Sequence, residues 1–303
     1  MTSAEPPASA LTGVGADSRV VTASDGVELH YLRWLSGRSP PGAVVIFLHG
    51  IASHGGWFGE TARDLSNRGV AVYAPDRRGS GRSSGPRGHL ARYERALDDV
   101  DQVVRLVSAE HSGTPTFLAA SSWAAKLAVV YVAQRRAPLA GLMLLGPGLV
   151  SRVHLPPGQR VRVVVGHLVA PAARLPIPLT PELYTANPHY LDVIRADRLR
   201  LLEATAQFFW ETARLDRGRR RASTRLDLPL LLLQGEADGM VDVPGTRRWF
   251  DRLAIEDKTY RAYPGAGHTL DFEADRTRYV ADMLDWLSAR AAPGTPDLTG
   301  GAR

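Results

Sequence analysis

The chain alternates between short apolar stretches and longer stretches in which apolar residues recur at helical spacing. Short runs rich in Val, Leu and Ile and bounded by Gly or Pro are typical of buried strands, whereas helical spacing predicts amphipathic helices. Strands are predicted at residues 43–49, 70–75, 116–120, 139–145, 230–234 and 259–263, and an antiparallel hairpin at 19–22 and 28–35. Helices are predicted at residues 57–67, 92–108, 122–134, 244–253 and 275–289. This alternation predicts an α/β fold with a doubly wound, mostly parallel sheet.

One long segment departs from this alternation. It carries prolines at positions 156, 157, 171, 176, 178, 181 and 188, followed by a helical pattern at residues 197–215. Such a segment does not continue a sheet, yet it is too apolar for a linker. We therefore expect an inserted lid at residues 149–224, within a core formed by residues 18–148 and 225–291. Residues 1–17 and 292–303 are expected to be a flexible arm and a flexible tail.

The predicted lid helix has an apolar side, formed by Leu201, Leu202, Ala206, Phe209 and Trp210. Such a face can line an acyl-chain pocket or touch a lipid surface. For any one of these residues, packing against the body of the protein is the more frequent role. We take Phe209 and Trp210 as candidate substrate contacts and expect at most transient contact between the lid and a lipid surface. The arginines at positions 214, 217 and 219–221 could attract a phosphate or an anionic interface, but a solvated charged face is the expected arrangement.

Composition narrows the classes of function. The 303 residues are 44% hydrophobic and 22% charged, as in ordinary globular proteins, which excludes disorder, collagen and coiled coils. There is no cysteine, so disulfide scaffolds, thiolate metal sites and a cysteine nucleophile are excluded. The net charge is +6, but 35 of the 37 basic residues are arginines scattered among acidic residues. Nucleic-acid binding is therefore not expected.

The sequence gives no signal for targeting, a metal or a cofactor. Its first residues lack the basic start and apolar run of a signal peptide, and its apolar stretches are much shorter than the roughly 18 to 20 residues of a spanning helix. We expect a cytoplasmic protein without stable membrane insertion. No histidine pair or acidic cluster has ligand spacing, so neither a metal nor a cofactor is expected. The oligomeric state has no sequence signal.

The stretch FLAASSWAAKLAV, residues 117–129, places a serine between a predicted strand and a predicted helix. A nucleophilic serine on such a tight turn needs small residues two positions before and after it. Ala120 and Ala124 meet this requirement for Ser122, whereas Trp123 breaks it for Ser121. Both glycines of the G-x-S-x-G pattern are absent, so on this motif alone the serines are as well explained as a helix cap.

Two more polar residues follow strand ends. Asp238 lies in QGEADGMVD after the strand at 230–234, with Glu236 and Asp242 as rivals that could instead cap a helix. His268 lies in the Gly-rich turn after the last strand. Sites assemble where parallel strands end, and Ser122, Asp238, His268 is the chain order of the α/β-hydrolase triad. We therefore predict that Ser122 is the nucleophile, His268 its base, and Asp238 the carboxylate that orients His268.

The loop in FLHGIASHGGWF, residues 47–58, is rich in small residues that let its backbone approach a substrate oxygen. We predict that the N–H groups of Ile51 and Trp123 form an oxyanion hole. His49 is expected to brace this loop and not to act as a base. Gly50 and Trp57 are, with Phe209 and Trp210, the expected substrate contacts.

These motifs together resemble an α/β-hydrolase, and more narrowly the monoacylglycerol lipase/lysophospholipase group, also called serine-aminopeptidase-like hydrolases. The D-x-x-G-x-G-x-S pattern of that group matches Asp76, Gly79, Gly81 and Ser83, and the resemblance spans about residues 20–287. It implies an eight-stranded sheet with an inserted helical lid, the triad and oxyanion hole named above, and a small-molecule acyl ester as substrate. The elbow A-S-S-W-A departs from G-x-S-x-G, which puts the catalytic rate and the preferred acyl group in question.

Three alternatives to a serine esterase stay open. The same triad serves acyltransferases and thioesterases, which differ only in the acyl acceptor. It also serves peptidases, in which lid acids such as Glu182, Asp192 or Asp197 would bind a substrate amino terminus. The altered elbow also fits a non-catalytic binding protein of this fold, although all three triad residues are present.

Overall fold

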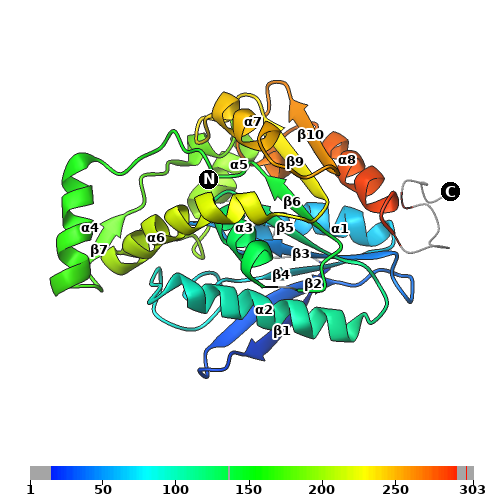
Figure 1. Ribbon diagram of the computed structural model, residues 1–303, viewed down its shortest axis with the longest axis horizontal. Coiled ribbons are helices and arrows are strands. Elements are labelled where there is room, and N and C mark those ends of the chain that lie inside the picture. Colours follow the sequence, from blue (N-terminus) through cyan, green and yellow to red (C-terminus); the bar gives the residue numbers. More distant parts are fainter. Residues whose placement is uncertain (1–14, 136, 292–297, 299–303) are drawn as a thin grey trace, which may run out of the picture.

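The fold is built on one eight-stranded sheet, seen in the computed structural model, which describes residues 15–135, 137–291 and 298 (Figure 1). The strands lie in the order β1-β2-β4-β3-β5-β6-β9-β10, and only β2 runs against the others. They span β1 (Asp17–Thr22), β2 (Glu28–Trp34), β3 (Ala43–Leu48), β4 (Val70–Pro75), β5 (Thr116–Ser121), β6 (Gly141–Leu145), β9 (Leu230–Gly235) and β10 (Lys258–Tyr263). The predicted mostly parallel sheet and its antiparallel hairpin are confirmed.

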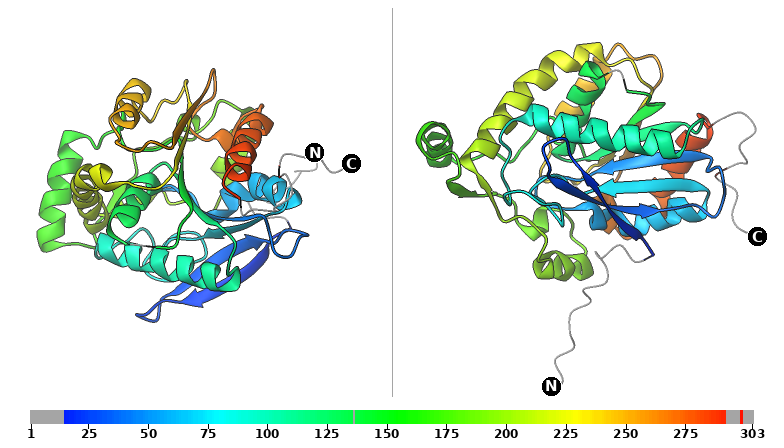
Figure 2. Two further views of the ribbon diagram at one scale, coloured as in Figure 1. Left: turned by 45° about the vertical axis from the view of Figure 1, so that its right-hand side comes forward. Right: turned by 90° about the horizontal axis from the view of Figure 1, so that it is seen from below.

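Helices cover both faces of the sheet (Figures 1 and 2). One face carries α2 (Tyr93–Glu110), α3 (Ala124–Gln134) and α7 (Val243–Asp251), and the other α1 (Gly59–Asn67) and α8 (Arg276–Ser288). Strand β3 shows why the central strands are apolar throughout. Val44 and Ile46 pack into the core beneath α2 and α3, whereas Val45 and Phe47 pack into the core beneath α1 and α8. Both faces of these strands are therefore buried.

The strand register brings the candidate residues to one edge of the sheet. Leu48 at the end of β3 pairs with Ala120 of β5, and Ser121 of β5 pairs with Leu145 of β6. Tyr263 at the end of β10 pairs with Gly235 at the end of β9. The loops that follow these strands therefore meet at their carboxyl ends, where sites form in open α/β sheets.

The chain between β6 and β9 adds no strand to this sheet. It forms α4 (Pro157–Val169), β7 (Arg174–Pro176), η2 (Pro181–Leu183), α5 (Pro188–Ala196), β8 (Glu203–Thr205), α6 (Ala206–Ala222) and η3 (Ser223–Arg225). Among the described residues, strands β7 and β8 pair with each other and with no further strand. Helix α6 packs on α3, while α4 packs on α6 and stands at the outer end of the molecule (Figure 1). We call this part of the chain the inserted segment.

The predicted helix at residues 197–215 is wrong at both ends. Helix α6 begins at Ala206, because Thr205 caps it with a side chain that accepts a hydrogen bond from the N–H of Phe208. Leu201 and Leu202 therefore lie before the helix, Leu201 buried and Leu202 62% exposed. Residues 197–202 lie outside any helix or strand, residues 203–205 form β8, and α6 continues beyond residue 215 to Ala222.

The ends of the chain fall largely outside the described residues. Of the predicted arm, residues 15–17 are described, and Asp17 already begins β1. Of the predicted tail only Leu298 is described, and its side chain is buried in the core beneath α1 and α8.

Candidate active site

Ser122 stands on a sharp turn between β5 and α3. Its φ of 53° is the only positive value of a non-glycine residue in the described chain. This left-handed conformation costs an L-residue free energy, and strained residues of this kind cluster at functional sites. Ala120 and Ala124, where the G-x-S-x-G pattern has glycines, are both buried. The turn is thus formed with alanines at these positions.

A glycine in the loop after β6 makes room for this turn. Gly148 donates its N–H to the carbonyl of Ser122 at 2.9 Å. A Cβ on Gly148 would lie 3.1 Å from the carbonyl carbon and oxygen of Ser122. Sequence reasoning did not single out Gly148, because its role is a contact between segments 26 residues apart in the printed sequence.

His268 and Asp238 form a buried pair. His268 Nδ1 lies 2.8 Å from Asp238 Oδ2, which also accepts a hydrogen bond from Gln234 Nε2 at 3.0 Å. Asp238 Oδ1 accepts hydrogen bonds from the N–H groups of Met240 at 2.8 Å and Val241 at 3.1 Å. Burial would raise the pKa of Asp238, but His268 and these donors outweigh it and hold the pKa below its usual value.

This arrangement fixes the proton on His268. An ionised carboxylate only accepts hydrogen bonds, so Nδ1 of His268 is the donor and Nε2 of the neutral ring is left as an acceptor. Nε2 is buried and has no hydrogen-bond partner within the described chain. Ser122 and His268 line the same two cavities. Nε2 of His268 is thus an acceptor without a partner among the described residues, on a residue that lines the same cavities as Ser122.

The two rival acids lie elsewhere. Glu236 is exposed, and Asp242 caps α7 by accepting a hydrogen bond from the N–H of Gly245. Of the three acids in this loop, only Asp238 contacts His268.

The backbone N–H groups of Ile51 and Trp123 flank Ser122. Ile51 follows β3, and Trp123 precedes the first residue of α3. Neither N–H donates a hydrogen bond to another group of residues 15–135, 137–291 or 298. The N-terminus of a helix also favours negative charge through its dipole. Both groups are therefore free to stabilise a developing oxyanion.

His49 and Arg77 grip the peptide unit that carries the Ile51 N–H. The carbonyl of Gly50 accepts hydrogen bonds from His49 Nδ1 at 2.9 Å and Arg77 Nη1 at 3.1 Å. The N–H of Arg77 donates to His49 Nε2 at 2.8 Å. Burial, with a smaller effect of Arg77, lowers the pKa of His49 to about 3, so His49 is neutral and its two nitrogens are used for bracing. This agrees with the expected role of His49.

Two cavities adjoin Ser122. The small pocket, about 10 Å³, includes Gly50, Ile51, Trp57, Tyr184 and His268 in its lining. The large cavity, about 1010 Å³, lies between α3, α6 and the loop after β6. Its apolar lining includes Leu149, Val153, Leu155, Ile177, Leu179, Phe209 and Met240. A cavity of this size is typical of small-molecule sites.

The four expected substrate contacts are thus placed differently. Gly50 and Trp57 line the small pocket and Phe209 lines the large cavity. Trp210 lines neither cavity and stacks on His167, with 4.2 Å between the ring centroids. No group of three or more His, Asp or Glu side chains within the described residues could hold a metal ion.

Comparison with known proteins shows which family this chain belongs to. A family model described as "Serine aminopeptidase, S33" matches residues 39–275. The chain belongs to this family. It is 29% identical to human monoglyceride lipase, over 89% of each chain, and 27% identical to a monoacylglycerol lipase of Mycolicibacterium smegmatis, over 86% of this chain and 93% of that one.

A solved structure supports the same fold. A soluble variant of the Saccharomyces cerevisiae monoglyceride lipase, in complex with a substrate analog, superposes with a TM-score of 0.83 at 20% identity, over 95% of this chain and all of that one. The fold of this S33-family chain is therefore that of the α/β-hydrolases.

The motif that the chain carries after β4 supports the loop after β3. Asp76 accepts hydrogen bonds from the N–H groups of Gly55 at 2.7 Å and Arg82 at 2.8 Å, and from His30 Nδ1 at 3.0 Å. Burial would raise the pKa of Asp76, but the hydrogen bond from His30, the nearby His49 and His54, and the N–H of Arg82 hold it at about 2. Gly81 has a φ of 52°, and a Cβ there would lie 2.3 Å from the Asp76 carboxyl carbon. The ionised carboxylate thus ties the loops after β3 and β4 together.

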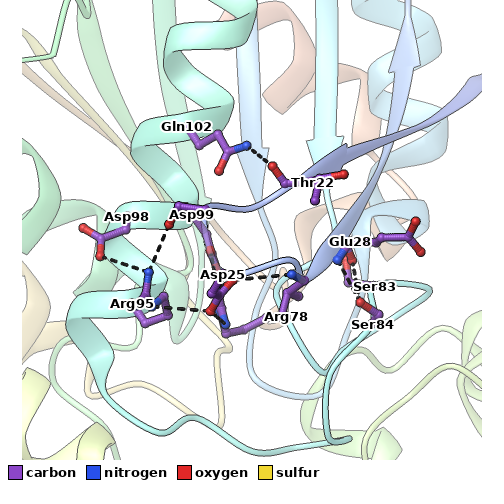
Figure 3. Close-up of polar contacts among 12 residues, drawn as sticks. Thr22, Asp25, Glu28, Arg78, Ser83, Ser84, Arg95, Asp98, Asp99 and Gln102 are labelled. Carbon is purple, nitrogen blue, oxygen red and sulfur yellow. Dashed lines mark hydrogen bonds and ion pairs between the residues drawn. The ribbon is translucent and has the colours of Figure 1, made fainter.

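Arg78, which lies between Asp76 and Gly79 of this motif, anchors the loop after β4 to α2 and to the β1–β2 turn (Figure 3). Arg78 donates to both carboxylate oxygens of Asp99 on α2 and to Asp25 in the β1–β2 turn, the latter at 3.0 Å. Ser83 and Ser84 accept hydrogen bonds from the N–H groups of His30 and Glu28 on β2. These residues therefore fix the loop after β4. None of them lines either of the two cavities at Ser122.

Besides Gly148, two residues of the site were missed by sequence reasoning. Arg77 lies over the Trp123 ring, with 4.8 Å from the guanidinium carbon to the ring centroid. Tyr184, from the inserted segment, lines the small pocket, and its buried hydroxyl has no hydrogen-bond partner within the described chain. Neither position carries a local signal, because both roles depend on contacts between distant segments.

None of the helices in the described part of the chain is long and apolar enough to cross a membrane.

Proposed function

We propose that this chain is a serine carboxylic-ester hydrolase that cleaves a monoacyl ester, such as a monoacylglycerol or a lysophospholipid. Ser122 is the nucleophile, His268 the general base, and Asp238 the group that orients His268. The observation that carries the proposal is the 2.8 Å contact between His268 Nδ1 and Asp238. It leaves Nε2 without a partner in the described chain, on a residue that lines the same two cavities as the strained Ser122. The named relatives are monoglyceride lipases, which supports an ester as substrate.

The reaction follows from these positions. Ser122 Oγ attacks the ester carbonyl carbon while its proton passes to His268 Nε2. The carbonyl oxygen becomes negative and is held by the N–H groups of Ile51 and Trp123. The C–O bond to the alcohol breaks, and the alcohol leaves with the proton from Nε2. Water then attacks the carbonyl carbon of the acyl-enzyme and gives a proton to Nε2. The bond between this carbon and Ser122 Oγ breaks, Nε2 returns its proton to Oγ, and the carboxylic acid leaves.

The charges near Ser122 favour an ester over a peptide amino terminus. The acids that a peptidase could use lie away from the cavities: Glu182 and Asp192 are exposed and pair with Arg195, and Asp197 pairs with His54. The large cavity is lined instead by several cations, which repel a protonated amine. An acyltransferase or thioesterase with the same triad stays open, and competing alcohol and amine acceptors would identify it through the products. A non-catalytic role leaves the strain at Ser122 unexplained.

Labelling with a fluorophosphonate tests the nucleophile. We expect the probe to modify about one residue per chain, and peptide mapping by mass spectrometry to place it on Ser122. The Ser121→Ala variant is the matched control, since its neighbour Ser122 is unchanged and labelling should persist. Modification of Ser121 in the wild-type chain, or no modification while a p-nitrophenyl ester is hydrolysed, would overturn the assignment.

We also propose that residues 149–224 act as a lid whose helix α4 touches lipid surfaces transiently. The helix presents a row of exposed apolar side chains, among which Leu168 is 74% and Val169 77% exposed. Other members of the row are Val161, Val164 and Val165, and Arg160 and Arg162 lie on the same helix. Apolar residues with flanking cations are typical of helices that lie at a membrane interface.

Vesicle binding tests this role. Leu168→Asp combined with Val169→Asp is expected to reduce cosedimentation with phosphatidylcholine vesicles containing phosphatidylglycerol about tenfold or more, because both apolar contacts are lost. Val20→Asp, at a 55% exposed residue of β1, is the matched control and should bind as wild type. Equal binding of all three proteins would exclude α4 as the contact.

A further inference from the structure

One part of the large cavity has a surplus of positive charge. Its lining includes Lys126 on α3, Arg160 on α4, and Arg219 and Arg220 on α6, but a single acid, Asp216. Three helices that are distant in sequence thus bring four cations to the cavity that also reaches Ser122. The pattern was not visible in the sequence, where Arg219 and Arg220 belong to an arginine run expected to be solvated.

The one acid is already shared. Lys126 Nζ lies 2.8 Å from Asp216 Oδ2, and Arg219 Nε lies 3.5 Å from Asp216 Oδ1. Lys126 is 8% and Arg219 7% exposed, and Arg219 Nε has no hydrogen-bond partner in the described part of the chain. Burial lowers the pKa of Arg219, and Arg220 adds to this effect, which indicates that Asp216 alone does not neutralise this group.

The other two cations have no acid at all. Arg160 Nε donates to the carbonyl of Leu155 at 2.8 Å, and within the described residues its side chain makes no ion pair. Over the same residues, no hydrogen bond or ion pair involves the exposed side chain of Arg220. Three positive charges are thus left over after Asp216 is counted, on groups whose N–H donors are mostly unused.

Lys126 and Arg219 are buried and share one carboxylate, so one of their two charges is left unbalanced, whereas Arg160 and Arg220 are exposed. An unbalanced buried charge is costly, because it has lost hydration without gaining a full partner. A ligand anion between α3 and α6 would provide the missing partner. Lys126 follows Ser122 by four residues, or about 6 Å along a helix axis, so that anion would lie within reach of an ester bound at Ser122. We propose that the large cavity binds a carboxylate or phosphate group carried by the ester substrate, through Lys126, Arg219 and Arg220. This inference rests on the proposed hydrolase function.

Calorimetry with a matched pair of amphiphiles tests the anion site independently of catalysis. Octyl phosphate and 1-octanol have the same chain and differ in charge, and neither is an ester of a carboxylic acid. We expect wild-type protein to bind octyl phosphate about tenfold or more tightly than 1-octanol below the concentration at which octyl phosphate forms micelles, because hydrogen bonds to charged groups are strong. Equal affinity for the two compounds would overturn the proposal.

Variants on α6 assign the site. Arg220→Gln, at an exposed residue that does not threaten folding, is expected to weaken octyl phosphate binding about fivefold to tenfold. Arg221→Gln is the matched control, because Arg221 is an exposed arginine of the same helix that does not line the cavity. Asp216→Asn should strengthen binding severalfold by freeing Lys126 and Arg219, a gain that loss of structure does not produce. If Arg220→Gln and Arg221→Gln weaken octyl phosphate binding equally, general surface charge explains the preference for octyl phosphate, and the proposed site is wrong.

Two pairs of substrates show whether the acyl part or the alcohol part of the ester carries the anion. For the acyl part, the mono-p-nitrophenyl ester of octanedioic acid is compared with p-nitrophenyl octanoate. For the alcohol part, 1-decanoylglycerol 3-phosphate is compared with 1-decanoylglycerol. We expect kcat/KM to favour the anion about tenfold in one pair, with the preference reduced in Arg220→Gln. If neutral esters are cleaved and neither anionic ester is preferred, the proposal of an anionic substrate is wrong, but the proposed hydrolase activity is supported. If no ester is cleaved and Ser122 is not labelled, the hydrolase fails and the calorimetry alone reports on the anion site.

Discussion

Replacing Asp238 by asparagine is expected to lower kcat for p-nitrophenyl butyrate about 10⁴-fold, the effect of the same change in a serine protease triad. The amide oxygen of asparagine would satisfy the N–H groups of Met240 and Val241, which now donate to Asp238 Oδ1 at 2.8 and 3.1 Å. The amide nitrogen would then face His268 Nδ1. Because that nitrogen donates, Nδ1 must become an acceptor, and the proton moves to Nε2, which can no longer take the proton of Ser122.

The same loop offers two matched controls. Asp242→Asn keeps an oxygen to cap α7, and Glu236→Gln changes an exposed side chain, so both should retain kcat within about twofold of wild type. Thermal unfolding of each variant checks that it folds. A kcat for Asp238→Asn within tenfold of wild type, or the same loss in Asp242→Asn, would remove Asp238 from the triad.

The placement of Ser122, Asp238 and His268 could be predicted because the information is local. Ser122 and Asp238 follow short apolar runs that are buried on both faces, whereas His268 follows the edge strand β10, of which only Tyr263 is buried. Parallel strands end on one side of the sheet whatever the rest of the chain does. The elbow is similar: small residues two positions before and after Ser122 meet a steric demand of the turn, which is formed here with Ala120 and Ala124. Patterns of this kind need no knowledge of distant contacts.

The contents of the cavities could not be predicted for the opposite reason. Lys126 and Asp216 are 90 residues apart, and only the packing of α6 on α3 brings them within 2.8 Å. Arg77 and Arg78 are neighbours of the same type, yet Arg77 turns inward over Trp123 and Arg78 bonds to Asp99 and Asp25. A loop has no periodicity from which the direction of either side chain can be read.

The error at the start of α6 has a definite cause. Apolar spacing continues upstream of the helix through Leu201 and Leu202, so periodicity alone extends the helix. Thr205 is a helix-capping residue type, and it stops the helix at Ala206 while β8 pairs with β7. The cap signal was therefore present in the sequence, and the longer apolar pattern concealed it.

Replacing Arg77 by methionine is expected to lower kcat about 10²-fold with little change in KM. Arg77 donates to the carbonyls of Gly50 at 3.1 Å and Ile51 at 3.0 Å. The Gly50 carbonyl and the Ile51 N–H belong to one planar trans peptide, so they point in opposite directions and a grip on the oxygen sets the direction of the N–H. Loss of one oxyanion donor costs about 10²- to 10³-fold in kcat, which is the upper limit for a residue that only aims the donor.

Two measurements separate this positioning role from a structural one. A boronic acid inhibitor, which forms a charged tetrahedral adduct with a serine, should lose affinity in Arg77→Met roughly in proportion to kcat/KM, because both depend on the oxyanion hole. Arg77→Lys should recover only part of kcat, since a single ammonium cannot donate to both carbonyls with the planar geometry of the guanidinium. If Arg77→Met instead raises KM with kcat unchanged, Arg77 acts on substrate binding and not on the direction of the Ile51 N–H.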